Sequence, residues 1–106
     1  MLYKFKSRAA ADLVMLEPAG RRLLEVLGRE PSSQGIFEAA DLHGLMQRLD
    51  RAIELEEAML EQAERDAQGK GQTIRRPEVS LRQRLWPMRE MMRRAQAEGH
   101  DIVWGV

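Results

Sequence analysis

The feature that most restricts the fold is a long stretch of apolar residues at helical spacing in the middle of the chain. Leucine, methionine, isoleucine and alanine recur there at intervals of mostly three and four, with charged residues between them: Leu42, Leu45, Met46, Leu49, Ala52, Ile53, Met59, Leu60 and Ala63. This spacing places them on one face of an α-helix. We therefore predict one amphipathic helix over residues 40–67, about 40 Å long at 1.5 Å per residue, whose apolar face must be covered by other elements.

A second helix is predicted to begin at Ser80. Ser80 followed by Gln83 is a capping-box pattern, and Gly99 suits the end of a helix because glycine adopts the left-handed conformation easily. Pro87 lies inside this stretch and has no backbone N–H. We therefore expect either a bend near Trp86 or the start of a separate segment there.

The two helices are separated by residues 67–79, which contain two glycines and one proline but no apolar periodicity. Such a composition is typical of a connection rather than of a packed element. We expect residues 67–79 to form a mobile loop.

The first residues alternate between apolar and polar side chains. Within residues 2–6, Tyr3 and Phe5 point to one side and the two lysines to the other, which is typical of a strand with one solvent-exposed face. Residues 7–12 suit a hairpin loop. Residues 13–17 begin with four apolar residues in a row, so we expect a second strand that either has both faces covered or lies inside the sheet.

A short helix is expected next, because Pro18 suits a first helical turn and Gly28 suits a left-handed turn after the last one. Residues 36–38 are too short to assign, and are compatible with a brief strand or an extended segment. Residues 102–106 alternate like a strand. Pairing of this strand with the N-terminal hairpin would satisfy its backbone and bury the ring of Trp104.

Together these elements predict a single α+β domain over residues 1–106. Its small antiparallel sheet consists of the N-terminal hairpin and the C-terminal strand. A short helix and two longer helices cover one face of that sheet. A chain of 106 residues can bury one core of this kind without cross-links.

The composition excludes several kinds of site and protein. The chain has no cysteine, which rules out disulfides and cysteine-ligated zinc or iron–sulfur sites. No stretch reaches the roughly 20 apolar residues of a membrane helix, and the sequence starts without the apolar region of a signal peptide. We therefore expect a cytoplasmic protein.

Charge is balanced overall, with 17 basic and 17 acidic residues, but it is unevenly distributed. Residues 41–66 hold three basic and eight acidic residues, whereas residues 70–94 hold eight basic and two acidic ones. The basic block could attract nucleic acid, but the acidic block offers it an opposite charge in the same chain. We expect the two blocks to neutralise each other, within the monomer or across a dimer, and we do not expect nucleic-acid binding.

Three stretches together carry a resemblance to a known family: "MLYKFKS" with "ADLVMLEPAG", "LRQRLWPMREMMRRA", and "GHDIVWGV". The chain resembles the small bacterial proteins grouped as domain of unknown function 1840, nearly from end to end. The resemblance implies a soluble bacterial protein with no established activity, and it supplies no catalytic residues. The residues that match the family pattern are Pro18, Arg84, Trp86, Pro87, Trp104 and Gly105.

The chain lacks motifs for catalysis and for metal binding. Neither His43 nor His100 lies in an HxxxH, HxH or HExxH pattern, and none of the four serines lies in a GxSxG turn. A solvated helix face explains the paired carboxylates of the acidic block better than acid–base catalysis does. We therefore expect a non-enzymatic protein without a cofactor.

The main functional prediction is an interaction surface on the helices. A helix of about 40 Å is longer than a few short strands can cover. The apolar face near Met59 and Leu60 should therefore be exposed, and exposed apolar patches usually bind a partner. The run 86–92, which includes Met91, could form an adaptable groove or simply fill the core. We expect self-association, most simply as a dimer, or binding of another protein.

The alternative hypothesis is a protein that binds a small molecule or a metal ion. Arg84, Trp86 and His100 would then line a pocket, because an arginine beside a tryptophan can bind a carboxylate or phosphate while the ring stacks on an apolar group. The position of Arg84 separates the two hypotheses. It points into a pocket in the alternative, and it pairs with a helix carboxylate in the interaction hypothesis.

Overall fold

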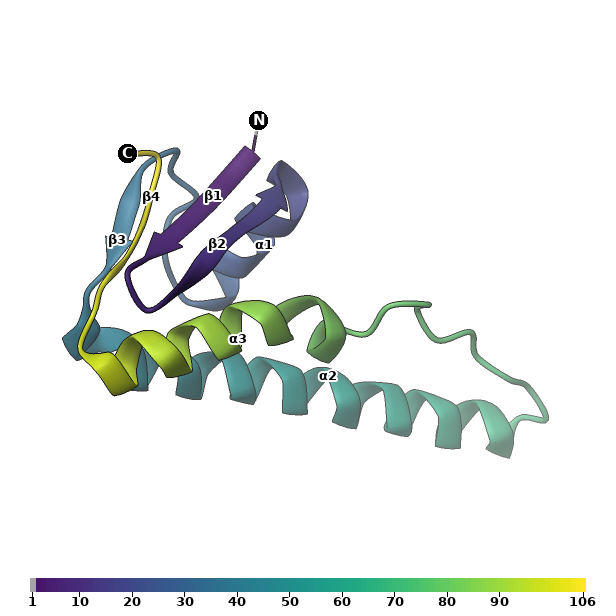
Figure 1. The fold of residues 1–106 in the computed structure, drawn as a ribbon. Coiled ribbons are helices and arrows are strands. Elements are labelled where there is room, and N and C mark those ends of the chain that lie inside the picture. Colours follow the sequence, from purple (N-terminus) through teal and green to yellow (C-terminus); the bar gives the residue numbers. More distant parts are fainter. Residues whose placement is uncertain (1) are drawn as a thin grey trace.

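Residues 2–106, which the computed structural model describes, form a four-stranded antiparallel sheet and three α-helices. The strands are β1 (Leu2–Ser7), β2 (Ala10–Leu16), β3 (Gly35–Phe37) and β4 (Ile102–Trp104). The helices are α1 (Glu17–Val26), α2 (Leu42–Gly69) and α3 (Leu81–Glu98), with a 3₁₀ turn at Ala39–Asp41 before α2. In Figure 1, α2 and α3 run side by side below the sheet, and α1 lies beside the β1–β2 hairpin. The predicted α+β class is confirmed.

The C-terminal strand pairs with the N-terminal hairpin, as the alternation of its residues predicts. The strand order is β2-β1-β4-β3, and in the β1–β4 pair Phe5 lies opposite Trp104. The segment around Ile36, which the sequence left unassigned, is a brief strand on the other side of β4. β4 is therefore an inner strand with a neighbour on both sides, which explains why an apolar segment follows the last helix.

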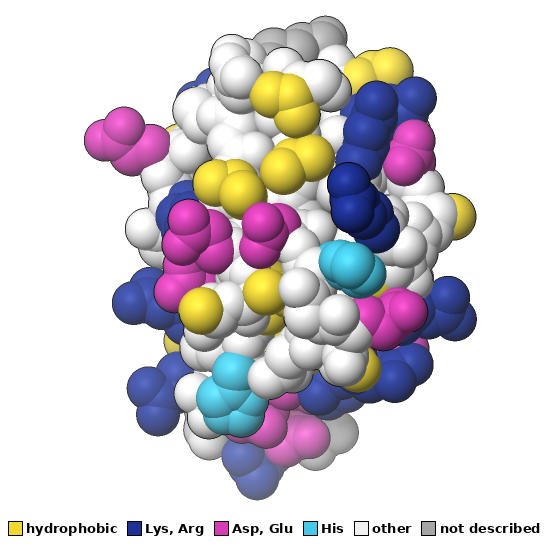
Figure 2. Space-filling view, turned by 60° about the vertical axis from the view of Figure 1, so that its left-hand side comes forward, with side chains coloured by type: hydrophobic (Ala, Val, Ile, Leu, Met, Phe, Trp, Pro, Cys, Tyr) yellow, Lys and Arg dark blue, Asp and Glu magenta, His cyan; other side chains and the backbone are white. Residues whose placement is uncertain are grey.

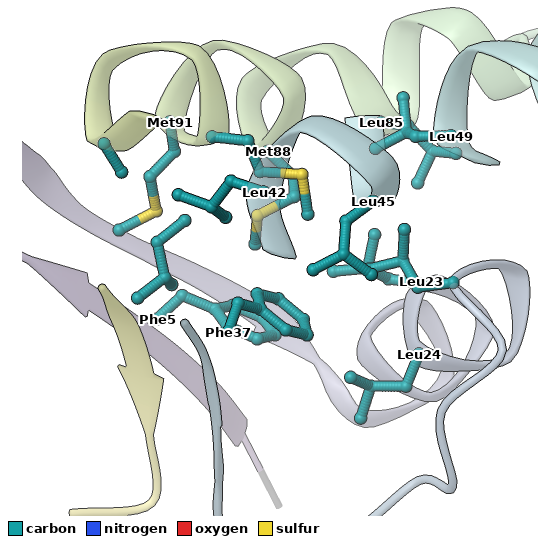
Figure 3. Packing of buried hydrophobic residues seen from close by; sticks show 14 of the residues in the cluster. Phe5, Leu23, Leu24, Phe37, Leu42, Leu45, Leu49, Leu85, Met88 and Met91 are labelled. Atoms are coloured by element: carbon teal, nitrogen blue, oxygen red, sulfur yellow. The ribbon is translucent and has the colours of Figure 1, made fainter. Parts of the chain in front are cut away.

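One face of the sheet is buried and the other is exposed. On β1, Tyr3 and Phe5 are at most 3% exposed, whereas Lys4 between them is exposed. Phe5, Phe37 and Trp104 form an aromatic cluster on the buried face. Figure 3 shows Phe5 and Phe37 facing leucines of α1 and α2 and methionines of α3. The three helices and the inner face of the sheet thus share one core.

Local signals in the sequence determine where α3 begins and ends. The Ser80 hydroxyl accepts the Gln83 N–H at 3.1 Å, and the Gln83 side-chain oxygen accepts the Ser80 N–H at 2.9 Å. These two bonds form the predicted capping box. Gly99, at φ +70°, ends the helix in the left-handed conformation. α3 is continuous through Pro87, so the alternative of a separate segment starting there is wrong.

The prediction that residues 13–17 form a strand covered on both faces or inside the sheet is wrong. β2 lies at the edge of the sheet, and Val14 and Leu16 are 53% and 68% exposed. Only Leu13 and Met15, which point to the other face, pack against the core. The side chains of this run of four apolar residues therefore alternate, with two on the core-facing side of the sheet and two on the exposed side.

Two predicted loops are shorter than expected. Within the expected loop over residues 7–12, only Arg8 and Ala9 lie between β1 and β2. Within the expected loop over residues 67–79, the first three residues belong to α2, which continues to Gly69. Mobility of the connection between α2 and α3 stays a prediction.

Candidate interaction surface

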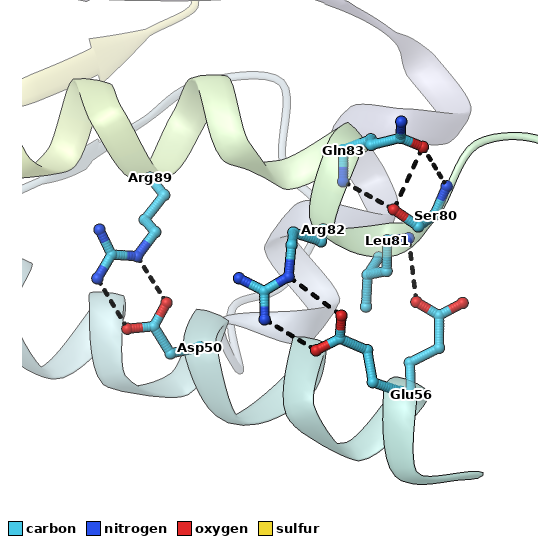
Figure 4. Close-up of polar contacts among 8 residues, drawn as sticks. Asp50, Glu56, Ser80, Leu81, Arg82, Gln83 and Arg89 are labelled. Atoms are coloured by element: carbon cyan, nitrogen blue, oxygen red, sulfur yellow. Dashed lines mark hydrogen bonds and ion pairs between the residues drawn. The ribbon is translucent and has the colours of Figure 1, made fainter. Parts of the chain in front are cut away.

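A row of ion pairs joins α2 to α3 (Figure 4). Arg89 donates from Nε and Nη2 to the two carboxylate oxygens of Asp50, at 2.7 and 3.1 Å. Arg82 makes the same two-bond contact with Glu57, at 3.1 and 2.8 Å. The paired carboxylates are seven residues apart on α2, as are the two arginines on α3. Antiparallel helices bring such equally spaced rows together.

These ion pairs bear on whether the basic block of residues 70–94 is neutralised within one chain or by a partner. A third pair joins Arg76 of the connection to Glu64 of α2. Acidic residues of α2 thus neutralise part of the basic block without a partner molecule. Within residues 2–106, four basic residues of this block form no ion pair: Lys70, Arg75, Arg84 and Arg94.

The same contacts shift the pKa values of the paired groups. Hydrogen bonds from Arg82 hold the pKa of Glu57 below its ordinary value of 4.5, and Glu57 in turn raises the pKa of Arg82. Within α3, Arg93 also pairs with Glu90, and its hydrogen bonds lower the pKa of Glu90 in the same way. A carboxyl group with a lowered pKa in the folded state stabilises the fold above its unfolded pKa, and this contribution is lost as the pH falls through the folded pKa.

We therefore expect the stabilising effect of the Arg82–Glu57 pair to disappear in acid. Urea unfolding of the wild type and of Arg82→Gln, measured at several values between about pH 7 and pH 3, tests this. The stability difference between the two proteins should be largest at neutral pH and should shrink below pH 4.5, where Glu57 becomes protonated. A difference that stays constant down to pH 3 would show that the pair contributes through packing rather than charge.

α2 extends well beyond the part that α3 covers. The first residue of α3, Leu81, lies opposite Glu56, whose carboxylate accepts its backbone N–H at 3.0 Å. From there α2 continues to Gly69, about 20 Å further at 1.5 Å per residue. Figure 1 shows this end of α2 projecting from the body, with the connection returning along it. The helix thus outruns the sheet, and the molecule measures 51 × 29 × 22 Å.

A second apolar row lies on α2, on roughly the opposite side from the carboxylates that pair with α3. Its centre consists of Leu55 and Met59, which are 59% and 64% exposed. The exposure of Met59 was predicted, but Leu55 was not singled out because it lies off the main apolar stripe. On both sides of this centre the row continues into polar residues, in alternating steps of four and three residues, which keep all of its members on one side of the helix. We call it the outer seam: Arg48, Ala52, Leu55, Met59, Gln62 and Asp66.

Met91, which was predicted for the partner surface, lies elsewhere. Met91 is 3% exposed and belongs to the core. It lies on the same apolar face of α3 as Met88. Of the two alternatives for the run 86–92, a groove or core filling, core filling is therefore correct for Met91. Leu60 is half-buried.

The structure does not bring Arg84, Trp86 and His100 into one pocket. His100 follows the last turn of α3, more than about 20 Å along the helix from the other two. Trp86 is 40% exposed and lies against the guanidinium groups of Arg82 and Arg89, at 5.9 and 5.0 Å from its ring. Arg84 is exposed and, among the described residues, pairs with no carboxylate. Arg84 therefore neither lines a pocket with Trp86 and His100 nor pairs with a helix carboxylate, which were the two positions expected for it.

His100 instead lines a hollow of about 540 Å³ between the end of the β1–β2 hairpin and the junction of α3 with β4. On the face shown in Figure 2, one of the two histidines lies beside a group of Lys and Arg side chains. Within residues 2–106, no three His, Asp or Glu side chains are arranged to hold a metal ion. No helix in the same part of the chain is both long and apolar enough to cross a membrane.

Sequence reasoning also missed the apolar residues on the exposed face of the sheet. Leu2, on the same face as Val14 and Leu16, is 59% exposed, and Ile36 on the opposite edge strand is 40% exposed. Lysines of β1 lie on this face as well. The alternation in residues 2–6 signalled one exposed face, but only the pairing of the strands shows that apolar residues share it.

Comparison with known proteins identifies the family but adds no activity. No curated protein and no solved structure matches the chain. The family described as "Domain of unknown function (DUF1840)" matches residues 1–104. This match covers nearly all of the 106 residues, so the chain belongs to the DUF1840 family.

Proposed function

We propose that this protein is a non-enzymatic interaction module that forms a dimer through the outer seam of α2. The observation that carries the proposal is that the outer seam is complementary to itself. When two α2 helices lie antiparallel with their twofold axis at residue 57, each seam residue faces a suitable seam residue of the other copy. The facing pairs are Leu55 with Met59, Ala52 with Gln62, and Arg48 with Asp66.

The apolar centre of the seam would supply the affinity. Leu55 and Met59 are more than half exposed, and full burial of such a side chain contributes about 1.5–3 kcal/mol. The twofold axis makes each contact occur twice. The neutralisation of the α3 arginines by other α2 carboxylates supports this arrangement, because α3 then leaves the seam free.

The charged ends of the seam would determine its orientation. Arg48 and Asp66 are both exposed, and a pair between them forms only when the two helices run in opposite directions. Ion pairs at the rim of an interface contribute more to orientation and register than to affinity. The seam therefore favours an antiparallel dimer over a parallel one.

Sedimentation velocity of the wild type and of the double variant Leu55→Glu/Met59→Glu tests the dimer. We expect a concentration-dependent dimer for the wild type and a monomer for the variant. The matched control is Leu16→Glu, which changes an equally exposed leucine on the sheet and should leave the dimer intact. A wild type that stays monomeric at high concentration would exclude the dimer, and dissociation by Leu16→Glu alone would move the interface to the sheet.

A charge exchange tests the register of the helices. Arg48→Glu and Asp66→Arg should each weaken the dimer, because each places like charges opposite one another. The two changes combined in one chain restore opposite charges across the axis and should recover most of the affinity. If the combined variant weakened the dimer by the sum of the two separate effects, the proposed pairing of Arg48 with Asp66 would be wrong.

The proposed setting is the cytoplasm of a bacterium, which the family resemblance and the absence of cysteine from the sequence support. Binding of a different protein on the outer seam is the other form of the same proposal. It predicts that Leu55→Glu/Met59→Glu abolishes complex formation in a monomeric wild type.

A further inference from the structure

The hollow beside His100 is distinct from the outer seam and has a chemistry of its own. Two segments far apart in the sequence form it, the tip of the β1–β2 hairpin and the junction between α3 and β4. Its volume of about 540 Å³ is in the range typical of small-molecule sites. The residues that line it are Lys6, Ser7, Arg8, Gly99, His100, Asp101 and Val103.

The hollow carries more positive than negative charge. Lys6 and Arg8 form no ion pair with any carboxylate in residues 2–106, in contrast to the arginines that join α3 to α2. Among the described residues that line the hollow, Asp101 is the only acidic one. Its Oδ1 accepts the backbone N–H of Ala39 at 2.7 Å, which holds this carboxylate toward the 3₁₀ turn before α2. Its single negative charge offsets only one of the two positive charges of Lys6 and Arg8.

Two further side chains with hydrogen-bonding groups, Ser7 and His100, accompany the two cations. The Ser7 hydroxyl oxygen accepts the Ala9 N–H at 3.3 Å, which leaves the hydroxyl hydrogen available to a ligand. The backbone N–H of His100 donates to the Ala95 carbonyl at 2.9 Å and caps the end of α3. The imidazole of His100 is therefore not needed for capping and can contact a ligand.

We propose that this hollow binds the phosphate group of a small molecule. An arginine donates two parallel hydrogen bonds to phosphate oxygens, a lysine supplies a point charge, and a serine hydroxyl adds a third kind of donor. A phosphate has enough acceptor oxygens for all of them. Val103 and Gly99 add a less polar wall for the rest of the molecule.

Titration of the ¹⁵N-labelled protein, followed by NMR at constant ionic strength, tests this site. The probes are inorganic phosphate, ribose 5-phosphate and, as a control anion, acetate. We expect both phosphates to produce saturable shifts confined to residues 6–8 and 99–103. Tighter binding of ribose 5-phosphate would indicate a phosphorylated small molecule, and equal binding would indicate free phosphate; both support a phosphate site.

Arg8→Gln should weaken phosphate binding about tenfold, because it removes a charged hydrogen-bond donor. Lys6→Gln provides a second variant on the neighbouring strand. The matched control is Arg84→Gln, which removes an exposed, unpaired arginine far from the hollow and should change the affinity less than twofold. The absence of saturable shifts, equal shifts with acetate, or equal weakening by Arg84→Gln would each overturn the proposal.

Discussion

Replacing Trp104 with alanine is expected to lower the free energy of unfolding by about 3–5 kcal/mol. Trp104 is 2% exposed, and its ring lies 4.7 Å from that of Phe37 and 5.5 Å from that of Phe5. Its indole N–H donates to the Ser32 carbonyl at 3.0 Å. The substitution therefore leaves a cavity on the buried face of the sheet and removes the partner of a backbone carbonyl. Urea unfolding followed by far-ultraviolet circular dichroism measures the loss.

The other tryptophan supplies the matched control for this experiment. Trp86 is 40% exposed on the surface of α3, where it contacts arginine side chains rather than the core. Trp86→Ala should therefore cost less than about 1 kcal/mol. Similar losses for the two variants would contradict the role of Trp104 as the centre of the sheet's buried face.

Replacing Gly20 with alanine is expected to destabilise the protein by about 1–3 kcal/mol, although alanine favours helices. Gly20 is a buried residue of α1, and a Cβ atom at this position would overlap the ring of Tyr3. Tyr3 is 3% exposed and belongs to the core, so its ring cannot move without disturbing the packing of α1 on β1. Thermal or urea unfolding of the variant tests the effect.

Gly44 is the matched control because it is also a helical glycine, near the start of α2. Among residues 2–106, and apart from its neighbours in the helix backbone, no atom lies within 4 Å of a Cβ atom placed there. Gly44→Ala should therefore stabilise the protein by about 0.5–1 kcal/mol, through the higher helix propensity of alanine alone. Changes of the same sign in both variants would show that helix propensity, and not the contact with Tyr3, determines the effect at Gly20.

The helices could be predicted because their signals are local. Apolar spacing identified α2, and Ser80, Gln83 and Gly99 marked the ends of α3. Each signal depends on residues within one or two helical turns. The pairing of β4 with the hairpin was also predictable, because an apolar strand that directly follows a helix end needs backbone partners and cover for Trp104.

The candidate surfaces were predicted only in part. The sequence indicated an exposed apolar end of α2 and named Met59. It missed Leu55, because this leucine lies off the main apolar stripe of α2. It left open whether Met91 lines a groove or fills the core, and it grouped Arg84 and Trp86 with His100 in one alternative pocket, because spacing along one helix does not show which face is covered or which end lies near the hairpin.

By itself, the sequence determined the α+β class, the approximate positions of the helices, and the balance between an acidic and a basic block. These properties follow from periodicity, capping residues and composition, which act between near neighbours in the chain. Only the tertiary structure decided that β2 is an edge strand, that Asp50 and Glu57 neutralise Arg89 and Arg82 within one molecule, and that the hairpin tip meets His100. These features depend on how distant segments pack, and several arrangements of the same elements satisfy the same local signals.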